Sequence, residues 1–187
     1  MQQTPTETET PTPTPTPTET ELVSPTPTET PTPTPTPESA SGFTVTVKEV
    51  GSDVVWSGAG TLNLTNLTVE NTTNMSPGYQ ANQAIWACGS SNSPSDFYGG
   101  AAFTIYPLAF DVFGAFVPPY SGEGSTFGIV PSLSPRAVVV PTGYVSNTYI
   151  SGSTLYQNTT IASMGLSGGT YVYSWGIDSM TLIIGNG

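Results

Sequence analysis

Apolar and polar residues alternate in short runs after residue 42, and almost no apolar residues recur at helical spacing. Phe43, Val45 and Val47 alternate with Thr and Lys residues, which is the period-two pattern of a strand with one buried face. Turn residues at Gly51 to Asp53 then precede the apolar run Val54 to Trp56. The pattern predicts two strands joined by a turn.

The apolar pattern changes phase once within the next segment. Leu62 and Leu64 point one way along an extended chain, whereas Leu67 and Val69 lie in the opposite phase. Such a slip predicts a β-bulge or a short turn at Thr65–Asn66.

The rest of the chain also consists of short apolar runs separated by turn residues. In all, roughly ten short strands are expected, with turn signals roughly every 8 to 15 residues. This spacing predicts an all-β domain with a β-sandwich or jelly-roll fold. The further expected strands are Ala102–Tyr106, Phe110–Val117, Phe127–Val130, Arg136–Val140, Thr159–Ala162, Thr170–Trp175 and Ser179–Ile184. The expected connections include Ser90–Ser95, Pro118–Gly124 and Gly165–Gly169, and the one helical candidate is a turn near Ala81–Ala87. Because Trp175 follows Tyr171 and Tyr173 on one strand face, we expect it to anchor the core.

Residues 1–41 form a different region, built almost entirely from Thr, Pro, Glu and Ser. Thr6–Thr20 is nearly repeated by Ser24–Ser39. Alternating prolines fix φ and remove every second amide donor, which predicts an extended arm that is polyproline II or disordered. Leu22 and Val23 are the only apolar pair in the repeat, so we expect them to bind a partner, the alternative being a solvated spacer. The predicted organisation is an arm, residues 1–41, and a β domain, residues 42–187.

Charge narrows the range of partners. Lys48 and Arg136 are the only strong cations against 13 carboxylates, and the formal net charge is −11. Binding to nucleic acid or to an anionic membrane requires several basic side chains, so neither partner is expected. The first 20 residues lack a leader pattern and no apolar run is long enough to span a membrane, so we expect synthesis in the cytoplasm.

Side chains for nucleophilic or metal-assisted catalysis are scarce. The sequence has no histidine, which excludes Ser-His-Asp and Cys-His arrangements and histidine metal sites. Cys88 is the only cysteine, so it cannot form an intramolecular disulfide, and its apolar neighbours predict a buried, inert thiol.

Acidic residues leave two chemical alternatives open. A glycosidase needs only two carboxylates in a cleft, and calcium needs only carboxylates and carbonyls. No pair and no Asp-x-Asp-x-Asp spacing occurs, and a carboxylate beside a strand more often caps a turn by accepting backbone amides. We therefore expect no catalytic residue, no metal and no cofactor. The carboxylate candidates in the domain are Glu70, Asp96, Asp111, Glu123 and Asp178.

Tyrosines and asparagines are the remaining candidates for recognition. Tyrosines near loops could bind sugars or another protein, although about half should pack over the ends of a sandwich. Five Asn-x-Ser/Thr sequons occur, as expected by chance in a sequence rich in these residues. The tyrosines are Tyr98, Tyr106, Tyr120, Tyr144, Tyr149 and Tyr156, and the sequons are Asn63, Asn66, Asn71, Asn74 and Asn158.

The C-terminal stretch Val138–Gly185 resembles the end of cyanobacterial PEP-CTERM-type exported proteins. The matching residues fall in the family order, namely Gly165-Leu166, Gly169-Thr170-Tyr171, Trp175-Gly176 and Asp178. Asp53–Val69 is similar to the start of the same domain. The family's signal peptide and C-terminal sorting tail are missing from the sequence, so the resemblance implies the β domain and not the export route.

The Thr-Pro arm, in turn, resembles those of structural proteins in marine cyanophage virions. Together the two resemblances imply a non-enzymatic virion structural protein, either a capsid decoration or fibre or a tail-fibre component. The arm would attach to capsid or tail proteins and the β domain would project for adhesion or stabilisation, with a host-surface glycan as a possible ligand and a homo-oligomer as the expected state. The alternative is an extracellular or cell-surface module of a cyanobacterium that binds polysaccharide.

Overall fold

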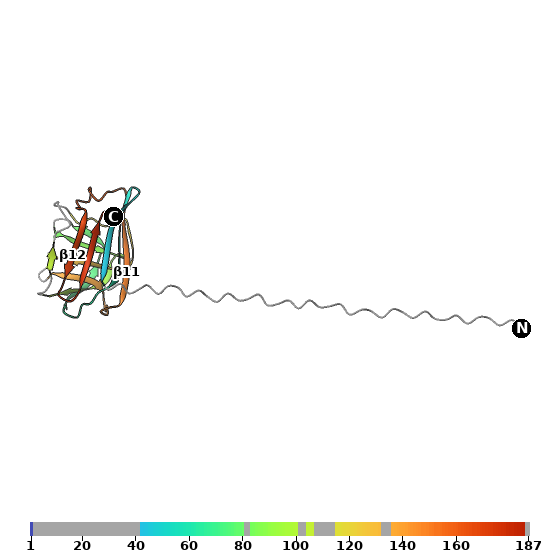
Figure 1. The fold of residues 1–187 in the computed structure, drawn as a ribbon, viewed down its shortest axis with the longest axis horizontal. Helices are drawn as coiled ribbons and strands as arrows, with labels where there is room; N and C mark the ends of the chain where they lie inside the picture. The colour runs from blue at the N-terminus through green and yellow to red at the C-terminus, as the bar shows by residue number, and fades with distance from the viewer. Residues whose placement is uncertain (2–41, 81–82, 101–103, 107–114, 132–135, 186–187) are drawn as a thin grey trace. The chain divides into compact units, whose positions relative to one another are not determined.

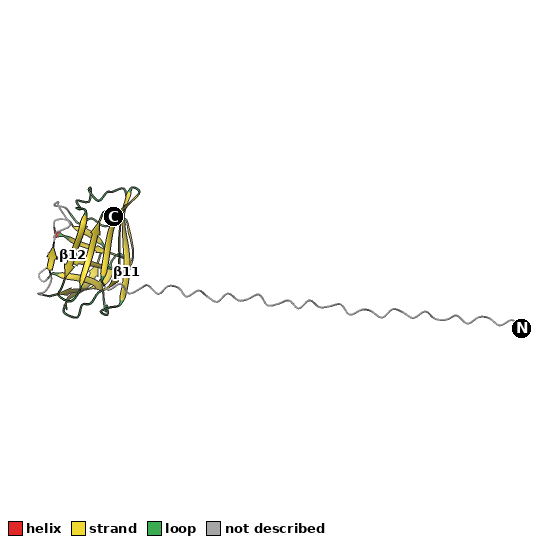
Figure 2. Ribbon diagram, in the orientation of Figure 1, coloured by secondary structure: helices red, strands yellow, loops and turns green. Residues whose placement is uncertain are grey.

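The β domain is a sandwich of two sheets. The computed structural model describes Met1 and residues 42–80, 83–100, 104–106, 115–131 and 136–185. Within these residues the chain forms thirteen strands and no α-helix (Figures 1 and 2), which confirms the all-β prediction. No helix long and apolar enough to cross a membrane occurs in this part of the chain. The predicted arm, including Leu22 and Val23, lies outside the described residues apart from Met1, so the boundary at residue 42 stays a prediction.

One sheet has seven strands in the order β7-β12-β13-β1-β2-β11-β8. Its neighbours pair antiparallel except β1 and β13, which are parallel. The strands are β1 (Phe43–Val50), β2 (Asp53–Thr61), β7 (Thr104–Tyr106), β8 (Ser121–Gly124), β11 (Tyr149–Tyr156), β12 (Gly169–Ser174) and β13 (Ser179–Ile184).

The second sheet has six strands in the order β3-β6-β10-β9-β5-β4, all antiparallel. They are β3 (Thr68–Met75), β4 (Gly78–Gln80), β5 (Ile85–Cys88), β6 (Ser93–Gly99), β9 (Phe127–Val130) and β10 (Ala137–Pro141). The edge strand β3 is polar, and its side chains are exposed along almost its whole length.

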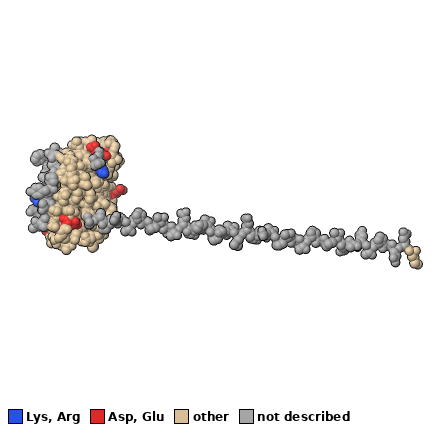
Figure 3. Space-filling view, viewed as in Figure 1, with Lys and Arg blue, Asp and Glu red and all other residues tan. Residues whose placement is uncertain are grey.

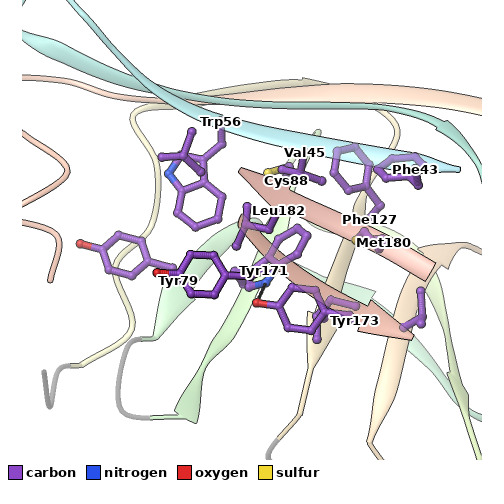
Figure 4. Close-up of a cluster of buried hydrophobic side chains, with 14 of the residues drawn as sticks. Phe43, Val45, Trp56, Tyr79, Cys88, Phe127, Tyr171, Tyr173, Met180 and Leu182 are labelled. Atoms are coloured by element: carbon purple, nitrogen blue, oxygen red, sulfur yellow. Dashed lines mark hydrogen bonds between the residues drawn. The ribbon is translucent and has the colours of Figure 1, made fainter. Parts of the chain in front are cut away.

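Aromatic rings from both sheets fill the space between them (Figure 4). Phe43 of β1 meets Phe127 of β9 edge-on at 4.7 Å, and Trp56 of β2 lies 5.8 Å from Trp86 of β5. Trp86 Nε1 also donates a hydrogen bond of 3.4 Å to the Tyr173 hydroxyl across the core. These contacts make the sandwich one packed unit, since rings of this size each bury a large apolar area.

The predicted alternation accounts for the first hairpin. Phe43, Val45 and Val47 are buried while Thr44 and Lys48 are exposed, as a strand with one core face requires. The predicted phase slip is a turn at Thr65–Asn66, closed by a hydrogen bond of 2.9 Å from Leu67 N to Leu64 O. Val69 is nevertheless exposed, because it lies on the polar edge strand β3, where a further irregularity falls between Val69 and Asn71.

Several predicted boundaries are confirmed in the second half of the domain. Phe127–Val130 and Ser179–Ile184 are strands with the predicted bounds, and Arg136–Val140 and Thr170–Trp175 match β10 and β12 to within a residue at each end. The predicted strand at Ala102–Tyr106 is described only as β7. Phe110–Val117 lies outside the described residues up to residue 114, and Val117 forms an isolated bridge with Tyr79.

Other predictions were wrong. The expected helical turn at Ala81–Ala87 is confined, in the described part, to Gln83 and Ala84, because Trp86 and Cys88 alternate into the core as strand β5. Thr159–Ala162 was expected as a strand and is a loop, whose backbone pairs instead with Ser52 and with its own turn.

Strands β6, β8 and β11 are among those that were not predicted, because polar residues and glycine interrupt their apolar pattern. β6 and β8 overlap the expected connections Ser90–Ser95 and Pro118–Gly124, and β11 was not expected at all. These strands are rich in Ser, Gly and Thr, and they are held in place by ladders to apolar neighbours such as β10 and β2.

Candidate functional site

Two of the carboxylates that the sequence offered as acids, bases or ligands, Asp96 and Asp178, hold separate elements of the fold together. Asp96 of β6 is 7% exposed and accepts hydrogen bonds from Thr72 Oγ1 (2.7 Å) and from the Gly143 amide (2.9 Å). It thereby joins strand β3 to the turn after β10. A buried carboxylate with two donors in place acts as a structural tie.

Asp178 has a similar role at the β12–β13 turn. Its carboxylate accepts from the Asn63 amide (2.6 Å) and the Ser179 amide (2.8 Å), and Trp175 Nε1 donates to the Asn63 carbonyl (2.8 Å). Trp175 and Asp178 therefore clamp Asn63 from both sides and tie this turn to the loop after β2. Both residues therefore have a structural role.

The other described acids also bind neighbouring groups, on separate parts of the surface. Asp53 and Glu49 accept backbone amides from Asn158 (2.9 Å) and Ile161 (2.8 Å), and both bonds hold the loop after β11. Glu70 accepts a hydrogen bond from Thr68 Oγ1 at 2.7 Å, and Glu123 accepts one from Ser153 Oγ at 3.3 Å. Asp111 lies outside the described residues. Among those residues no three His, Cys, Asp or Glu side chains lie together in a way that could hold a metal ion.

Cys88 is buried between the sheets, as predicted. Its side chain is 0% exposed, and burial raises the pKa of the thiol to about 12, although Thr154 Oγ1 donates to the sulfur at 3.7 Å. A neutral thiol without solvent access is a poor nucleophile.

The tyrosines divide between packing and the surface. Tyr156 is buried and Tyr98 is half-buried, whereas Tyr120 and Tyr149 are 70% and 45% exposed. The Tyr144 hydroxyl accepts from the Leu62 amide (2.9 Å) and donates to the Thr148 carbonyl (2.7 Å), which pins a loop. The side chain of Tyr106 lies outside the described residues.

Four of the five sequon asparagines are exposed and the fifth is half-buried. That one, Asn63, accepts hydrogen bonds on Oδ1 from the amide (3.1 Å) and hydroxyl (2.6 Å) of Thr65, within the clamp described above. The exposed set is Asn66, Asn71, Asn74 and Asn158.

The outer face of the seven-stranded sheet is covered by small polar side chains. A shallow groove of about 680 Å³ crosses β1, β2, β11 and β8 there. Figure 3 shows this face largely free of charge, with acidic and basic side chains near its margins. The groove offers hydroxyl groups and the Glu123 carboxylate but no aromatic ring. Its lining also includes Thr44, Thr46, Ser57, Ala59, Ser151 and Ser153.

A second hollow combines aromatic, proline and amide side chains at one end of the sandwich. It has a volume of about 430 Å³, and we call it the Tyr–Pro cleft. Buried rings form its base, where Tyr79 and Tyr156 meet edge-on at 5.5 Å. The cleft is lined chiefly by Tyr79, Pro118, Pro119, Tyr120, Tyr156 and residues 157–159.

Backbone hydrogen bonds fix the wall of the Tyr–Pro cleft. Val117 exchanges two bonds with Tyr79 of β4 (3.1 and 2.9 Å), and the Tyr120 amide donates to the Leu155 carbonyl of β11 (2.8 Å). The two prolines between them therefore bridge an edge of one sheet to the other. The sequence placed Tyr120 and Tyr156 near loops, but it did not indicate that β4, the proline segment and the end of β11 meet.

Comparison with known proteins adds no relative: no protein family, no curated protein and no solved structure matches this chain. The cleft is therefore interpreted from its own chemistry.

Proposed function

We propose that this chain is a non-enzymatic structural protein of a virion, a capsid decoration or fibre or a tail-fibre component. Its N-terminal arm attaches to capsid or tail proteins, and its β domain projects from the particle. The resemblance of the Thr-Pro arm to cyanophage structural proteins supports the location, and the resemblance of the domain to exported surface proteins supports the projecting role.

The hydrogen bonds of the acidic side chains support the proposal that the protein is not an enzyme. All six carboxylates in the described part of the chain accept hydrogen bonds, and Asp96 and Asp178 each accept two, which join separate elements of the fold. Glu123 lines the groove on the outer face, but no second carboxylate lies in that lining, whereas a glycosidase needs two carboxylates in one cleft. The acids therefore favour a rigid scaffold over acid–base chemistry.

Purified virions from the source test the location. Mass spectrometry should find the protein at a fixed copy number in the particle. Deletion of residues 1–41 should then leave a folded domain that no longer assembles, because the attaching segment is gone. A truncated protein that incorporates at full copy number would refute attachment by the arm, and absence of the protein from virions would refute the location.

The Tyr–Pro cleft favours a second candidate, a polysaccharide-binding module. Its one exposed ring, Tyr120, lies in the same cleft as the amide side chains of Gln157 and Asn158, a combination suited to sugar rings and their hydroxyls. Neighbouring genes separate the two candidates, since capsid or tail genes favour the virion and polysaccharide or exosortase genes favour the cell surface. A glycan array with the full chain gives the direct measurement, and the polysaccharide-binding candidate requires that Tyr120→Ala abolish any signal.

A further inference from the structure

The Tyr–Pro cleft and the point where the arm joins the domain lie at opposite ends of the seven-stranded sheet. The arm meets β1 at Phe43, which pairs with Gly60, and Gly60 in turn pairs with Ile150 of β11. Six residues further along β11, Tyr156 pairs with Val54 and lines the cleft. At about 3.3 Å per residue, the two points are separated by about 20 Å along the strand.

The cleft has the chemistry of a site for extended, proline-rich chains. Grooves that bind polyproline II segments are lined by aromatic rings, against which proline rings of the ligand pack. Tyr120, 70% exposed on a pinned backbone, offers such a ring, and Pro118 and Pro119 continue the apolar wall. None of the side chains that line the cleft carries a charge.

Amide side chains that also line the cleft supply the polar contacts such a ligand needs. A polyproline II backbone makes no internal hydrogen bonds, so its carbonyl oxygens remain available as acceptors. Gln157 and Asn158 are exposed at the cleft, and within the described part of the chain their side-chain amides have no hydrogen-bond partner. They can therefore donate to a bound backbone.

The chain itself contains the matching ligand. Pro11–Thr18 and Pro31–Pro37 alternate Thr and Pro without any charge, and every glutamate of the arm lies outside these tracts. Charge selects these tracts, because the domain carries two cations against seven acids and would repel the glutamate-bearing parts of an arm. An uncharged tract in an uncharged cleft avoids that cost.

We propose that the Tyr–Pro cleft of one copy binds an uncharged Thr-Pro tract in the arm of a second copy. Since the arm joins the domain at one end of the seven-stranded sheet and the cleft lies at the other, the contact is head-to-tail and extends into linear chains of subunits. The second tract and Leu22–Val23 stay available to other partners. This association between copies does not depend on the virion location, so either can fail alone.

Sedimentation velocity of the full chain over a wide concentration range tests the association. The wild-type chain should form larger species as its concentration rises, and moderate salt should strengthen them by screening repulsion between acidic copies. Tyr120→Ala should weaken association about tenfold or more, as expected for an aromatic anchor. Tyr149→Ala is the matched control, since it removes an exposed tyrosine that does not line the cleft.

A peptide with the sequence of residues 11–18 tests the ligand. It should dissociate the oligomers, and in NMR spectra of the full chain it should shift the amides of Tyr120, Gln157 and Asn158. The same peptide with alanine for each proline should do neither. The proposal is overturned if the chain is monomeric at every concentration, if the peptide shifts residues elsewhere, or if oligosaccharides and not the peptide shift these amides.

Gln157→Ala serves as a second cleft variant if Tyr120→Ala changes the melting temperature. It should weaken association without affecting the fold, because Gln157 is exposed. Unchanged association in both variants contradicts the proposal.

Discussion

At the scale of single residues, large buried rings concentrate stability in a few positions. Trp175 is 0% exposed, and its indole N–H donates a hydrogen bond of 2.8 Å to the Asn63 carbonyl. This burial confirms the expectation that Trp175 packs into the core. The same ring also takes part in the clamp on Asn63, so its removal affects both packing and a loop.

Trp175→Ala should destabilise the domain by about 3 to 5 kcal/mol, because it leaves a large cavity and frees a buried carbonyl. Urea unfolding followed by circular dichroism measures the change. Val172→Ala, at a 43% exposed position on β12, the strand that precedes Trp175, is the control and should change stability by about 0.5 kcal/mol or less. A Trp175→Ala variant as stable as wild type would rule out the anchoring role.

Cys88 should be unreactive in the native protein. Its sulfur is fully buried and burial raises its pKa to about 12, so little thiolate forms at neutral pH and none of it is accessible. A thiol-modifying reagent at pH 8 should label the chain only after denaturant is added. Rapid labelling of the folded chain would contradict the buried position.

At the scale of elements, polar side chains align strands whose own sequences are weak. The edge strand β3 has no buried side chain, and its ladder to β6 is supported by the bond from Thr72 to Asp96. The same carboxylate holds the turn at Gly143. Asp96 of β6 thus positions both the edge strand β3 and the turn that follows β10.

Asp96→Asn should cost about 1 to 3 kcal/mol, because the amide nitrogen cannot accept one of the two hydrogen bonds and would itself face a donor at a buried position. Chemical denaturation measures the loss, and hydrogen exchange should show β3 and the Gly143 turn opening more often. Glu123→Gln is the matched control, since Glu123 is exposed and makes one longer bond of 3.3 Å. Equal stability of both variants would contradict the structural role of Asp96.

At the scale of the whole molecule, the domain has its own packed core between two sheets, with the described rings and aliphatic side chains all after residue 42. The isolated segment 42–187 should therefore fold alone, giving a β-type circular dichroism spectrum and one cooperative melt. A chelator should leave the melt unchanged. A large fall in melting temperature with chelator would instead indicate a bound calcium ion.

Alkaline pH should destabilise the domain, because the buried thiol and tyrosine hydroxyl groups keep their protons only in the folded state. Burial raises the pKa of Cys88 from 9.0 to about 12 and that of Tyr173 from 10.0 to about 12, and it also raises the pKa of Tyr156. Between about pH 9 and 12 the unfolded chain loses these protons and the native domain keeps them, so stability falls as pH rises.

Urea unfolding at pH 8, 10 and 11 measures this slope. Cys88→Val removes one of the groups with little change in volume, so its stability should fall less steeply above pH 9. A wild-type stability that stays constant across this range would contradict the assignment.

The sequence by itself determined the fold class and the strands in which apolar residues alternate with polar ones. β1 and β13 were predictable because each has one core face that only one register can bury, and β9 because it is a short apolar run between turn residues and is buried throughout. The buried thiol at Cys88 and the core position of Trp175 followed from their apolar neighbours in the same way.

Only the tertiary structure decided the polar strands and the cleft. β6, β8 and β11 are strands because ladders to neighbouring strands satisfy their backbones, and such long-range pairing leaves little trace in a local pattern. Asp96 and Asp178 join separate parts of the fold because they accept hydrogen bonds from the amides of Gly143 and Asn63, which are far away in the sequence. The Tyr–Pro cleft likewise exists only because segments around residues 79, 118 and 157 meet at one end of the sandwich, where two sheet edges are bridged.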